Sequence, residues 1–387
     1  MKTSFCSDRE GSIVGRDGQS GRLIRIGWRD GIVSRMESAD GDPEAYPWIM
    51  SSLLDLQVNG FNGVDFQDVA ISVEDLERAA LGLQQHGCGG CLVTLITDDW
   101  DAMLAKLRRW VSFCADRPDL RQFFVGWHLE GPFLSEKNGF RGAHPAEFMR
   151  DPEAGDLHKI LGITGSDPVL LTVAPERNGV ISLIEQSVRA GVRVSLGHTA
   201  ADGAQLDAAV EAGARGVTHF GNGCPQMWER HDNWFWSVVD RANLFVGLIP
   251  DGIHLPAPVF RGMHRALRER NQIYYTTDAM SAAGAGPGRY ALAGQVLEVG
   301  VDQVVRQPGQ PNFAGSALSP LDGISRAMDM TGESWRSIWS RYSAVPAQFM
   351  GLDLELKLGA PSRFCLVNVS SDGELEEVVI HYAEACS

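Results

Sequence analysis

Polar side chains suited to catalysis recur at the ends of short apolar runs in this sequence. Four of them are Glu130 in WHLEG, His198 in SLGHT, His219 in GVTHF and Asp278 in YYTTD. A carboxylate and two imidazoles form a common ligand set for zinc or iron and leave one position for water. A further aspartate nearby could carry protons. Together these side chains predict a metal-assisted hydrolytic site, provided that the fold brings them together.

Each of these residues also has a purely structural interpretation. A single histidine after a strand commonly hydrogen-bonds within the core, and an aspartate there commonly caps the next helix. Other polar residues hold the same relative position in their own runs: Gln57, Asn59, Asp98, His128, Glu176, Asp251 and His254. Recurrence at one relative position in several runs favours a shared site over separate structural roles.

Eight apolar runs, each followed by a helical pattern, predict a closed barrel. They span residues 52–60, 91–99, 123–131, 169–177, 192–200, 216–223, 244–252 and 273–280. Continuous apolar strands separated by helices indicate a parallel sheet buried on both faces, and eight such units indicate an α/β fold of the (β/α)8 TIM-like type. The alternative, a doubly wound open sheet, would begin with a glycine-rich phosphate-binding turn, which QVNGFNG does not match. In such a barrel the active site forms at the C-terminal ends of the strands.

The two ends of the chain differ from the middle. Short apolar pieces punctuated by Gly and Asp fill the first fifty residues, and RFCLVNVSSDGELEEVVIHY near the C-terminus predicts two strands joined at an Asp-Gly turn. We therefore expect residues 1–52 and 351–387 to form one small β-sandwich domain, and residues 53–350 to form a metal-dependent catalytic barrel.

Composition limits the function classes. The 387 residues include 34 Lys and Arg against 49 Asp and Glu, a net charge of −15 that argues against nucleic acid or anionic membrane as a partner. No apolar run approaches the roughly 18 residues that span a bilayer, and the N-terminus lacks a signal-peptide pattern. Seven scattered cysteines indicate reduced thiols. These features predict a cytoplasmic protein.

Six blocks of the sequence carry a more specific signal. WHLEGPFLSEKNGFRGAHP, SLGHT, VTHFGNG, PDGIH, TTDAMSAAGAGPGRY and FAGSALSP follow one another in this order. In order and spacing, from about Leu54 to the C-terminus, the chain resembles the N-acetylglucosamine-6-phosphate deacetylases of the amidohydrolase superfamily. The resemblance implies an enzyme that removes acetate from N-acetylglucosamine 6-phosphate.

The resemblance also implies roles for individual residues. Glu130, His198 and His219 correspond to the ligands of the catalytic metal. Asp278 corresponds to the residue that takes a proton from the attacking water and returns it to the leaving amine. His144 in GAHP corresponds to the histidine that hydrogen-bonds the acetyl carbonyl.

Four further positions correspond to contacts with the sugar phosphate. Asn222 and Gly223 lie where the family's loop after the sixth strand touches the substrate, and His254 lies on the phosphate side. Arg230 falls where the family places an arginine that reaches the phosphate bound to a neighbouring subunit. The resemblance therefore implies a homodimer in which Arg230 completes the partner's active site.

The first strand bears on the number of metal ions. Most of the superfamily has His-x-His there, which holds a second ion, whereas this chain has Gln57 and Asn59, as in single-metal deacetylases. Neutral amides replace imidazoles poorly as transition-metal ligands. We therefore predict one divalent ion per chain, with Zn²⁺ as the first expectation and Fe²⁺ accepted by the same ligands.

The loop after His219 departs from the family. It reads FGNGCPQMWERHDNWFW, and its aromatic residues Trp234, Phe235 and Trp236 either pack a helix or subunit contact or form a platform for a modified sugar. Two alternative substrates therefore stay open: the galactosamine epimer and an unphosphorylated N-acetylhexosamine. An alternative function also stays open, that of a non-catalytic protein that binds a sugar phosphate.

Overall fold

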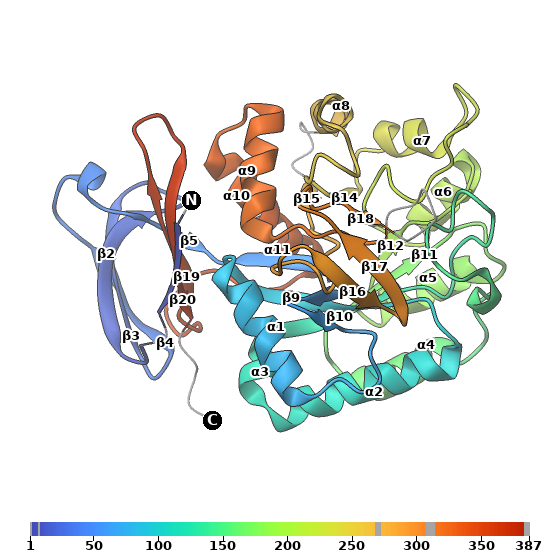
Figure 1. Cartoon of the computed structure of the whole chain (residues 1–387), viewed down its shortest axis with the longest axis horizontal. Helices are drawn as coiled ribbons and strands as arrows, with labels where there is room; N and C mark the ends of the chain where they lie inside the picture. The colour runs from blue at the N-terminus through green and yellow to red at the C-terminus, as the bar shows by residue number, and fades with distance from the viewer. Residues whose placement is uncertain (1, 7, 268–271, 307–313, 383–387) are drawn as a thin grey trace.

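A barrel of eight parallel strands forms the centre of the molecule (Figure 1). The structure is a computed structural model that describes residues 2–6, 8–267, 272–306 and 314–382, with the backbone alone for 2–6. The barrel strands are β6 (Leu53–Val58), β9 (Cys88–Ile96), β10 (Phe124–Glu130), β11 (Val169–Val173), β12 (Arg193–Leu196), β13 (Gly216–Val217), β14 (Phe245–Leu248) and β15 (Ile273–Tyr275). Each overlaps one of the eight predicted runs, so the predicted barrel is confirmed. Their sheet order is β15-β14-β13-β12-β11-β10-β9-β6.

The barrel closes between its first and last strands. Val58 and Ala279 form a parallel bridge, and the Asn59 amide donates to the Ala279 carbonyl over 2.7 Å. Deeper in the seam, the buried Asp55 carboxylate accepts hydrogen bonds from the hydroxyls of Thr276 and Thr277, at 2.5 and 2.6 Å. These bonds hold the end of β6 beside the segment that follows β15.

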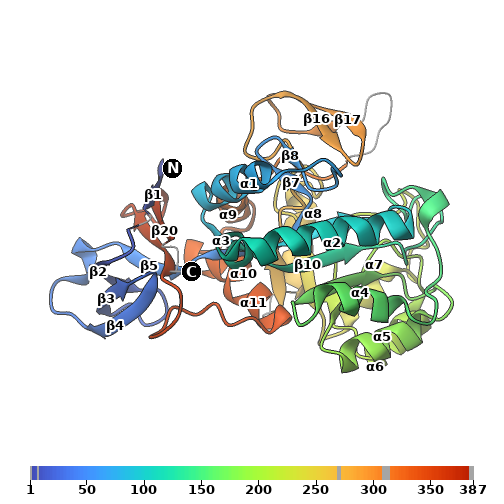
Figure 2. The same cartoon turned by 90° about the horizontal axis from the view of Figure 1, so that it is seen from below.

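Helices cover the outside of the barrel (Figures 1 and 2). They are α1 (Val73–Gln85), α2 (Trp100–Asp116), α3 (Pro118–Phe123), α4 (Asp156–Thr164), α5 (Val180–Arg189), α6 (Gly203–Glu211), α7 (Trp234–Asp240), α8 (Ala257–Leu267), α9 (Pro320–Thr331), α10 (Trp335–Tyr342) and α11 (Ala344–Met350). Helix α1 begins at Ser72, whose hydroxyl accepts from the Asp75 amide while the Asp75 carboxylate accepts from the Ser72 amide. No helix among the described residues is long and apolar enough to cross a membrane.

Two small sheets interrupt the barrel pattern. Strands β7 (Gly60–Phe61) and β8 (Val64–Asp65) form a hairpin after β6. Strands β16 (Gly288–Leu292), β17 (Gln295–Val299) and β18 (Val305–Arg306) form an antiparallel sheet after β15. In Figure 2 this second sheet projects from the barrel near β7 and β8.

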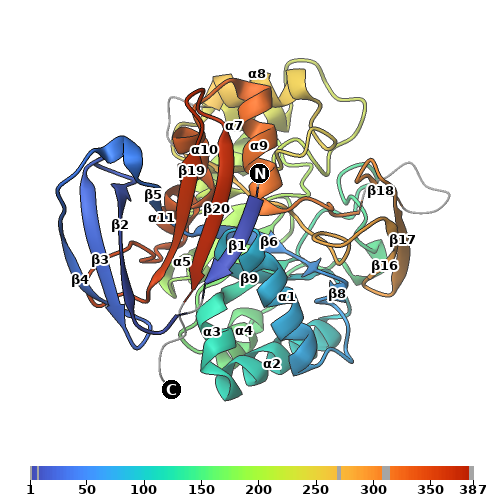
Figure 3. The ribbon, with the colours of Figure 1, turned by 60° about the vertical axis from the view of Figure 1, so that its left-hand side comes forward.

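The ends of the chain assemble one small β domain, as predicted (Figure 3). Its strands, in sheet order, are β1 (Lys2–Cys6), β20 (Leu375–Tyr382), β19 (Arg363–Val369), β5 (Trp48–Ser51), β2 (Gly11–Asp17), β3 (Leu23–Arg29) and β4 (Ile32–Ser38). The rings of Trp28 in β3 and His381 in β20 lie 4.2 Å apart. In a flat sheet these strands would be roughly 19 Å apart. The single sheet therefore bends back on itself, around a core that includes Ile26, Val33, Ile49 and Phe364.

Candidate active site

A cavity of about 570 Å³ lies at the C-terminal ends of the barrel strands. Its lining includes most of the residues that the sequence predicted for the site: Asn59, Glu130, His144, His198, His219, Asn222, Gly223, His254 and Asp278. Strands β6, β10, β12, β13, β14 and β15 or the loops after them supply these side chains. Sequence positions more than two hundred residues apart therefore meet in one cavity.

Glu130 is the centre of the cluster. It is the last residue of β10 and is only 2% exposed. Its Oε1 atom lies 2.8 Å from His219 Nε2 and 3.5 Å from His198 Nε2, and its Oε2 atom lies 4.0 Å from His144 Nε2. Burial alone would raise the pKa of Glu130, but hydrogen bonds from His198 and His219 outweigh it and hold the pKa well below its usual range. The group is thus held as a carboxylate.

The backbone aims three of these side chains by an uncommon conformation. His198, His219 and Asp278 have positive φ angles of 47°, 29° and 50°. Each follows the end of its strand by two or three residues. Residues other than Gly seldom adopt this left-handed backbone conformation, because it is strained. Strained residues of this kind concentrate at functional sites, where the surrounding structure holds them in place. The same local turn after three different strands points three polar side chains into one cavity.

The donor set fits a divalent transition metal ion. Ligand atoms of Glu130, His144 and His198 all lie within 4.8 Å of one another. The predicted ligands, Glu130, His198 and His219, differ from this group by one member, with His219 in place of His144. His219 and His198 both approach the same oxygen, Glu130 Oε1. Carboxylate oxygen and imidazole nitrogen are the ligands that zinc and iron accept. The Nδ1 atom of His219 is buried with no hydrogen-bond partner among the described residues.

Gln57 and Asn59 direct their amide groups at the two acidic residues. Gln57 Nε2 donates to Glu130 Oε2 over 3.1 Å, and Asn59 Nδ2 donates to Asp278 Oδ1 over 2.7 Å.

Asp278 lies in the cavity wall and is half-buried. Burial and the nearby negative charge of Glu130 raise the pKa of the Asp278 carboxyl to about 7. Hydrogen bonding from Asn59 opposes this increase. A carboxyl group with a pKa near neutrality can both accept and return a proton.

Thr97 positions His144, and sequence reasoning did not identify it. His144 Nδ1 lies 2.9 Å from Thr97 Oγ1, which also lies 3.2 Å from the main-chain oxygen of Glu130. If the Thr97 hydroxyl donates to Nδ1 of His144, the single imidazole proton is on Nε2. If the hydroxyl instead donates to the Glu130 oxygen, Nδ1 carries the proton and donates to Thr97, and Nε2 has a lone pair. Burial lowers the pKa of His144 to about 3, so the ring is neutral in either case.

Other polar residues from the strand ends serve the scaffold. His128 is buried between Thr94 and Thr172, with Nε2 2.7 Å from the Thr172 hydroxyl. Glu176 accepts from the Thr199 hydroxyl and the Ala200 amide, at 2.5 and 2.7 Å. His128 and Glu176 therefore have structural roles, which were the alternative interpretation for each polar residue at a strand end.

The residues predicted to contact the sugar phosphate divide into two groups. Asn222, Gly223 and His254 line the cavity, and the Asp251 carboxylate holds the His254 ring through Nδ1 at 2.6 Å. Burial alone would raise the pKa of Asp251, but His254 holds it below its usual value. Arg230 is exposed and does not line this cavity.

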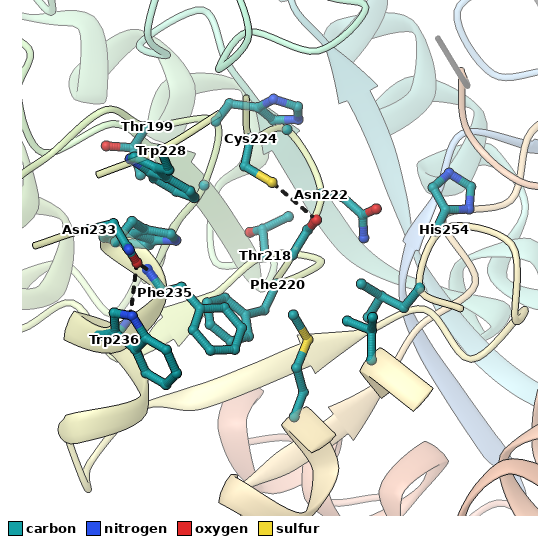
Figure 4. A pocket seen from close by; sticks show the side chains of 18 of the residues that line it. Thr199, Thr218, Phe220, Asn222, Cys224, Trp228, Asn233, Phe235, Trp236 and His254 are labelled. Atoms are coloured by element: carbon teal, nitrogen blue, oxygen red, sulfur yellow. Dashed lines mark hydrogen bonds between the residues drawn. The ribbon is translucent and has the colours of Figure 1, made fainter. Parts of the chain in front are cut away.

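The aromatic residues after His219 begin helix α7. Trp234 is buried, Phe235 stacks on Phe220 at 5.1 Å, and Trp236 is half exposed. All three line a second cavity beside the first (Figure 4). Trp234 and Phe235 also pack against the hydrophobic core, as the helix-packing alternative expects.

The barrel, its terminal β domain and the carboxylate-imidazole cluster at the strand ends define a hydrolase fold of the amidohydrolase type. No family model matches the chain. It is 30% identical over 329 residues to an N-acetylgalactosamine-6-phosphate deacetylase of Escherichia coli O157:H7, covering 84% of each chain. It is 32% identical over 331 residues to an N-acetylglucosamine-6-phosphate deacetylase of Mus musculus, covering 81% of this chain and 78% of that protein. The chain belongs to the N-acetylglucosamine-6-phosphate deacetylase family.

Solved structures agree on the fold. The N-acetyl-D-glucosamine-6-phosphate deacetylase from Mycobacterium smegmatis has a TM-score of 0.83 at 24% identity, covering 98% of this chain and 99% of that chain. The enzyme from Pasteurella multocida has a TM-score of 0.82 at 21% identity, covering 97% and 99%.

Proposed function

We propose that the protein removes acetate from N-acetylglucosamine 6-phosphate in a metal-dependent hydrolysis that yields glucosamine 6-phosphate. The observation that carries this proposal is the convergence of the Glu130 carboxylate, three imidazoles and the Asp278 carboxyl in one cavity at the strand ends. Family membership supplies the substrate, because relatives over most of the chain are named for it.

We assign the ion to Glu130, His198 and His219, as one divalent ion per chain. Bound there, it would activate water and polarise the acetyl carbonyl. Zn²⁺ is our first choice and Fe²⁺ the second, because both accept a carboxylate and two imidazoles. The amide donors of Gln57 and Asn59 support a single ion, since N–H groups aimed at Glu130 and Asp278 repel a second cation.

The other residues of the cavity move protons and hold the substrate. Asp278 accepts a proton from the attacking water and returns it to the amine nitrogen as the amide C–N bond breaks. One carboxyl can do both because the transfers are sequential. His144 donates from Nε2 to the acetyl carbonyl oxygen, which requires the Thr97 hydroxyl to donate to Nδ1.

Asn222, Gly223 and His254 contact the sugar phosphate, and Arg230 of a partner subunit supplies the positive charge. Among the described residues, neither Lys nor Arg lines the cavity. A phosphate dianion therefore needs a cation from elsewhere, which supports a homodimer with Arg230 reaching the neighbouring site. We place the protein in the cytoplasm.

We propose the domain division 1–52 with 351–387 for the β domain and 53–350 for the barrel. Only Ser52 separates β5 of the terminal sheet from β6 of the barrel, which supports the first boundary.

A second candidate substrate is N-acetylgalactosamine 6-phosphate, favoured by the 30% identity to the Escherichia coli O157:H7 relative. The test is acetate release by the metal-loaded protein from both sugar phosphates and from the two free sugars. The proposal expects turnover of N-acetylglucosamine 6-phosphate, loss of turnover on metal chelation, and recovery when Zn²⁺ is returned. Preference for the galactosamine epimer would shift the assignment, and no acetate release from any of the four would overturn it.

A further inference from the structure

A β-hairpin outside the barrel contributes to the lining of the catalytic cavity. Its strands β16 and β17 are joined by a two-residue turn of Ala293 and Gly294, whose φ angles are both positive, at 50° and 78°. A turn of this kind follows the twist of the two strands and fixes their register. Leu292 and Gln295 flank it as a cross-strand pair, and Leu292, Ala293 and Gln295 line the cavity. The tip of the hairpin therefore belongs to the site.

Hydrogen bonds hold the hairpin tip against the barrel. The Asp65 carboxylate, on β8, accepts from the Ala293 amide over 2.8 Å, and the Ser281 hydroxyl donates to the Ala291 carbonyl. Asp65 also accepts from the Gln67 amide over 2.9 Å, which orients the carboxylate. Because β8 follows β6 in the chain, the tip is fixed on the side of the first barrel strand, as Figure 2 shows.

Apolar side chains face the cavity on this side. Leu292 is 8% exposed and packs in a hydrophobic cluster with Ala314, and Ile96, the last residue of β9, packs against the same cluster. Ile96, Leu292 and Ala314 all line the cavity, and we call them the apolar wall. Asp98 lies close to Ile96 in the chain, but its carboxylate is paired with Lys106 over 2.6 Å.

The order of the barrel strands places the apolar wall opposite the sugar-side residues. Asn222 and Gly223 follow β13, the sixth barrel strand, and His254 follows β14, the seventh. In a closed barrel of eight strands the sixth lies across from the second, which here is β9 with Ile96 at its end. A substrate held by its sugar phosphate at β13 and β14 therefore points the opposite end of its amide, the acyl group, toward β9.

The residue next to Ile96 acts on the other substituent of the acyl carbon. Thr97 Oγ1 lies 2.9 Å from Nδ1 of His144, the residue assigned to the acetyl carbonyl oxygen. The carbonyl oxygen and the methyl group of acetyl are attached to the same carbon atom, so the groups that receive them must be neighbours. Consecutive residues at the end of β9 can meet this requirement, Thr97 through His144 and Ile96 by direct contact.

We propose that Ile96 and Leu292 form the acyl subsite and restrict the acyl group that is removed to about the size of acetyl. This proposal rests on the proposed deacetylase function and deepens it at the methyl end of the amide. Covering a methyl group with these side chains is favourable, because apolar surface leaves water. A charged acyl group would lose its hydration there without gaining a partner. The subsite therefore selects a short alkanoyl group.

The test measures kcat/KM for N-acetyl, N-propionyl and N-butyryl glucosamine 6-phosphate on the metal-loaded protein. The two additional methylenes of butyryl must displace packed side chains, so the butyryl substrate should be poorer than the acetyl substrate by about tenfold or more. Leu292→Ala removes the branched end of one wall side chain and should raise the butyryl-to-acetyl ratio by about tenfold. A ratio near one in the wild-type chain, or an unchanged ratio in Leu292→Ala, would overturn the proposal.

Leu297→Ala is the matched control. Leu297 lies in β17 and is fully buried in the same cluster as Leu292, but it does not line the cavity. Its truncation should destabilise the hairpin and leave the butyryl-to-acetyl ratio unchanged. An equal rise of the ratio in Leu297→Ala would assign the effect to a loosened hairpin and overturn the direct role of Leu292. Ile96→Ala enlarges the subsite from the barrel side, and it replaces Leu292→Ala in the test if that variant does not fold.

Calorimetry separates this proposal from the proposed function. The acetyl and butyryl sugar phosphates are titrated into metal-loaded Asp278→Asn protein, with and without Leu292→Ala. Binding that weakens from acetyl to butyryl and recovers in Leu292→Ala, without hydrolysis of any substrate by the wild-type chain, would retain the subsite and overturn the deacetylase assignment. Hydrolysis of all three substrates with similar kcat/KM would overturn the subsite and retain the deacetylase assignment. Neither binding nor hydrolysis would overturn both.

Discussion

Asn59 donates a hydrogen bond to Asp278 over 2.7 Å, across the seam where the first and last strands of the barrel meet. Together with the Gln57 bond to Glu130, it directs N–H groups at both carboxyl groups of the site. An imidazole at either position would instead offer a lone pair to a cation. We therefore propose that these two residues limit the site to one ion.

We expect one divalent ion per wild-type chain, and two in the double variant Gln57→His with Asn59→His. Two added imidazoles restore the donors that a second ion needs. Elemental analysis of protein dialysed against Zn²⁺ measures the stoichiometry. The control is Asn178→His with Gln186→His, which makes the same exchanges at exposed positions. Two ions in the wild-type chain would contradict the prediction.

Replacing Asp278 by Asn should remove turnover without removing the substrate. An amide cannot take up the water proton, so kcat should fall by about 10²- to 10⁴-fold while bound metal and sugar-phosphate affinity remain. Acetate release and calorimetry measure the two effects. Asp98→Asn is the matched control, because Asp98 lines the same cavity but is paired with Lys106 at 2.6 Å. Full activity in Asp278→Asn would show that another group moves the proton.

Mixed dimers should test the role of Arg230 across subunits. Arg230→Ala and Asp278→Asn chains should each have low activity alone. If Arg230 serves the partner's site, a mixed dimer holds one complete site, because one chain supplies Asp278 and the other supplies Arg230. Acetate release should then recover after the two variants are unfolded and refolded together. No recovery, with mixed dimers present by native mass spectrometry, would place Arg230 outside the neighbouring site.

Asp55 should be a main source of barrel stability. Its buried carboxylate accepts from the hydroxyls of Thr276 and Thr277 and from the Thr277 and Gln57 amides. Asp55→Asn turns an amide N–H toward these donors, so the free energy of unfolding should fall by roughly 2–3 kcal/mol. Denaturant unfolding of the metal-loaded protein measures the loss. Asp17→Asn, at the partly exposed end of β2, should change it by less than about 1 kcal/mol.

The barrel was predictable because its signal is local and repeated. Each of the eight strands is an apolar run, and its burial on both faces requires no information from distant sequence. The strands β7, β8 and β16 to β18 were not predicted, because they lack the continuous apolar run that marks even the two-residue barrel strand β13. In β16 most side chains are exposed, so the sequence carries no apolar alternation to mark the strand.

The site residues also divide into those that the sequence identified and those that it did not. Glu130, His198, His219 and Asp278 were identified as candidates because each stands at the end of a recognisable strand. Thr97 was not, because a threonine is common at strand ends and its contact with His144 joins segments 47 residues apart. The second cavity is likewise lined by the loop after β13, by α7 and by α8, which no local sequence pattern brings together.

His381 should make the small β domain sensitive to acid. Burial lowers the pKa of its imidazole to about 4, where it packs between Trp28 and Phe364. The unfolded chain binds a proton near pH 6.5, so the unfolded state takes up the proton first as the pH falls. Stability from this group is therefore complete above pH 6.5 and declines between pH 6.5 and 4, by at most about 3 kcal/mol.

The measurement is denaturant unfolding between pH 7 and 4.5, followed by tryptophan fluorescence, to which Trp28 contributes beside His381. His381→Gln should lose part of the wild-type pH dependence, because glutamine does not titrate. His158→Gln, at an exposed helix position, should retain the full dependence. Identical pH profiles for wild type and His381→Gln would mean that the ring takes up its proton inside the folded domain without cost. In that case the packing of Trp28 and Phe364 around it must accommodate an imidazolium.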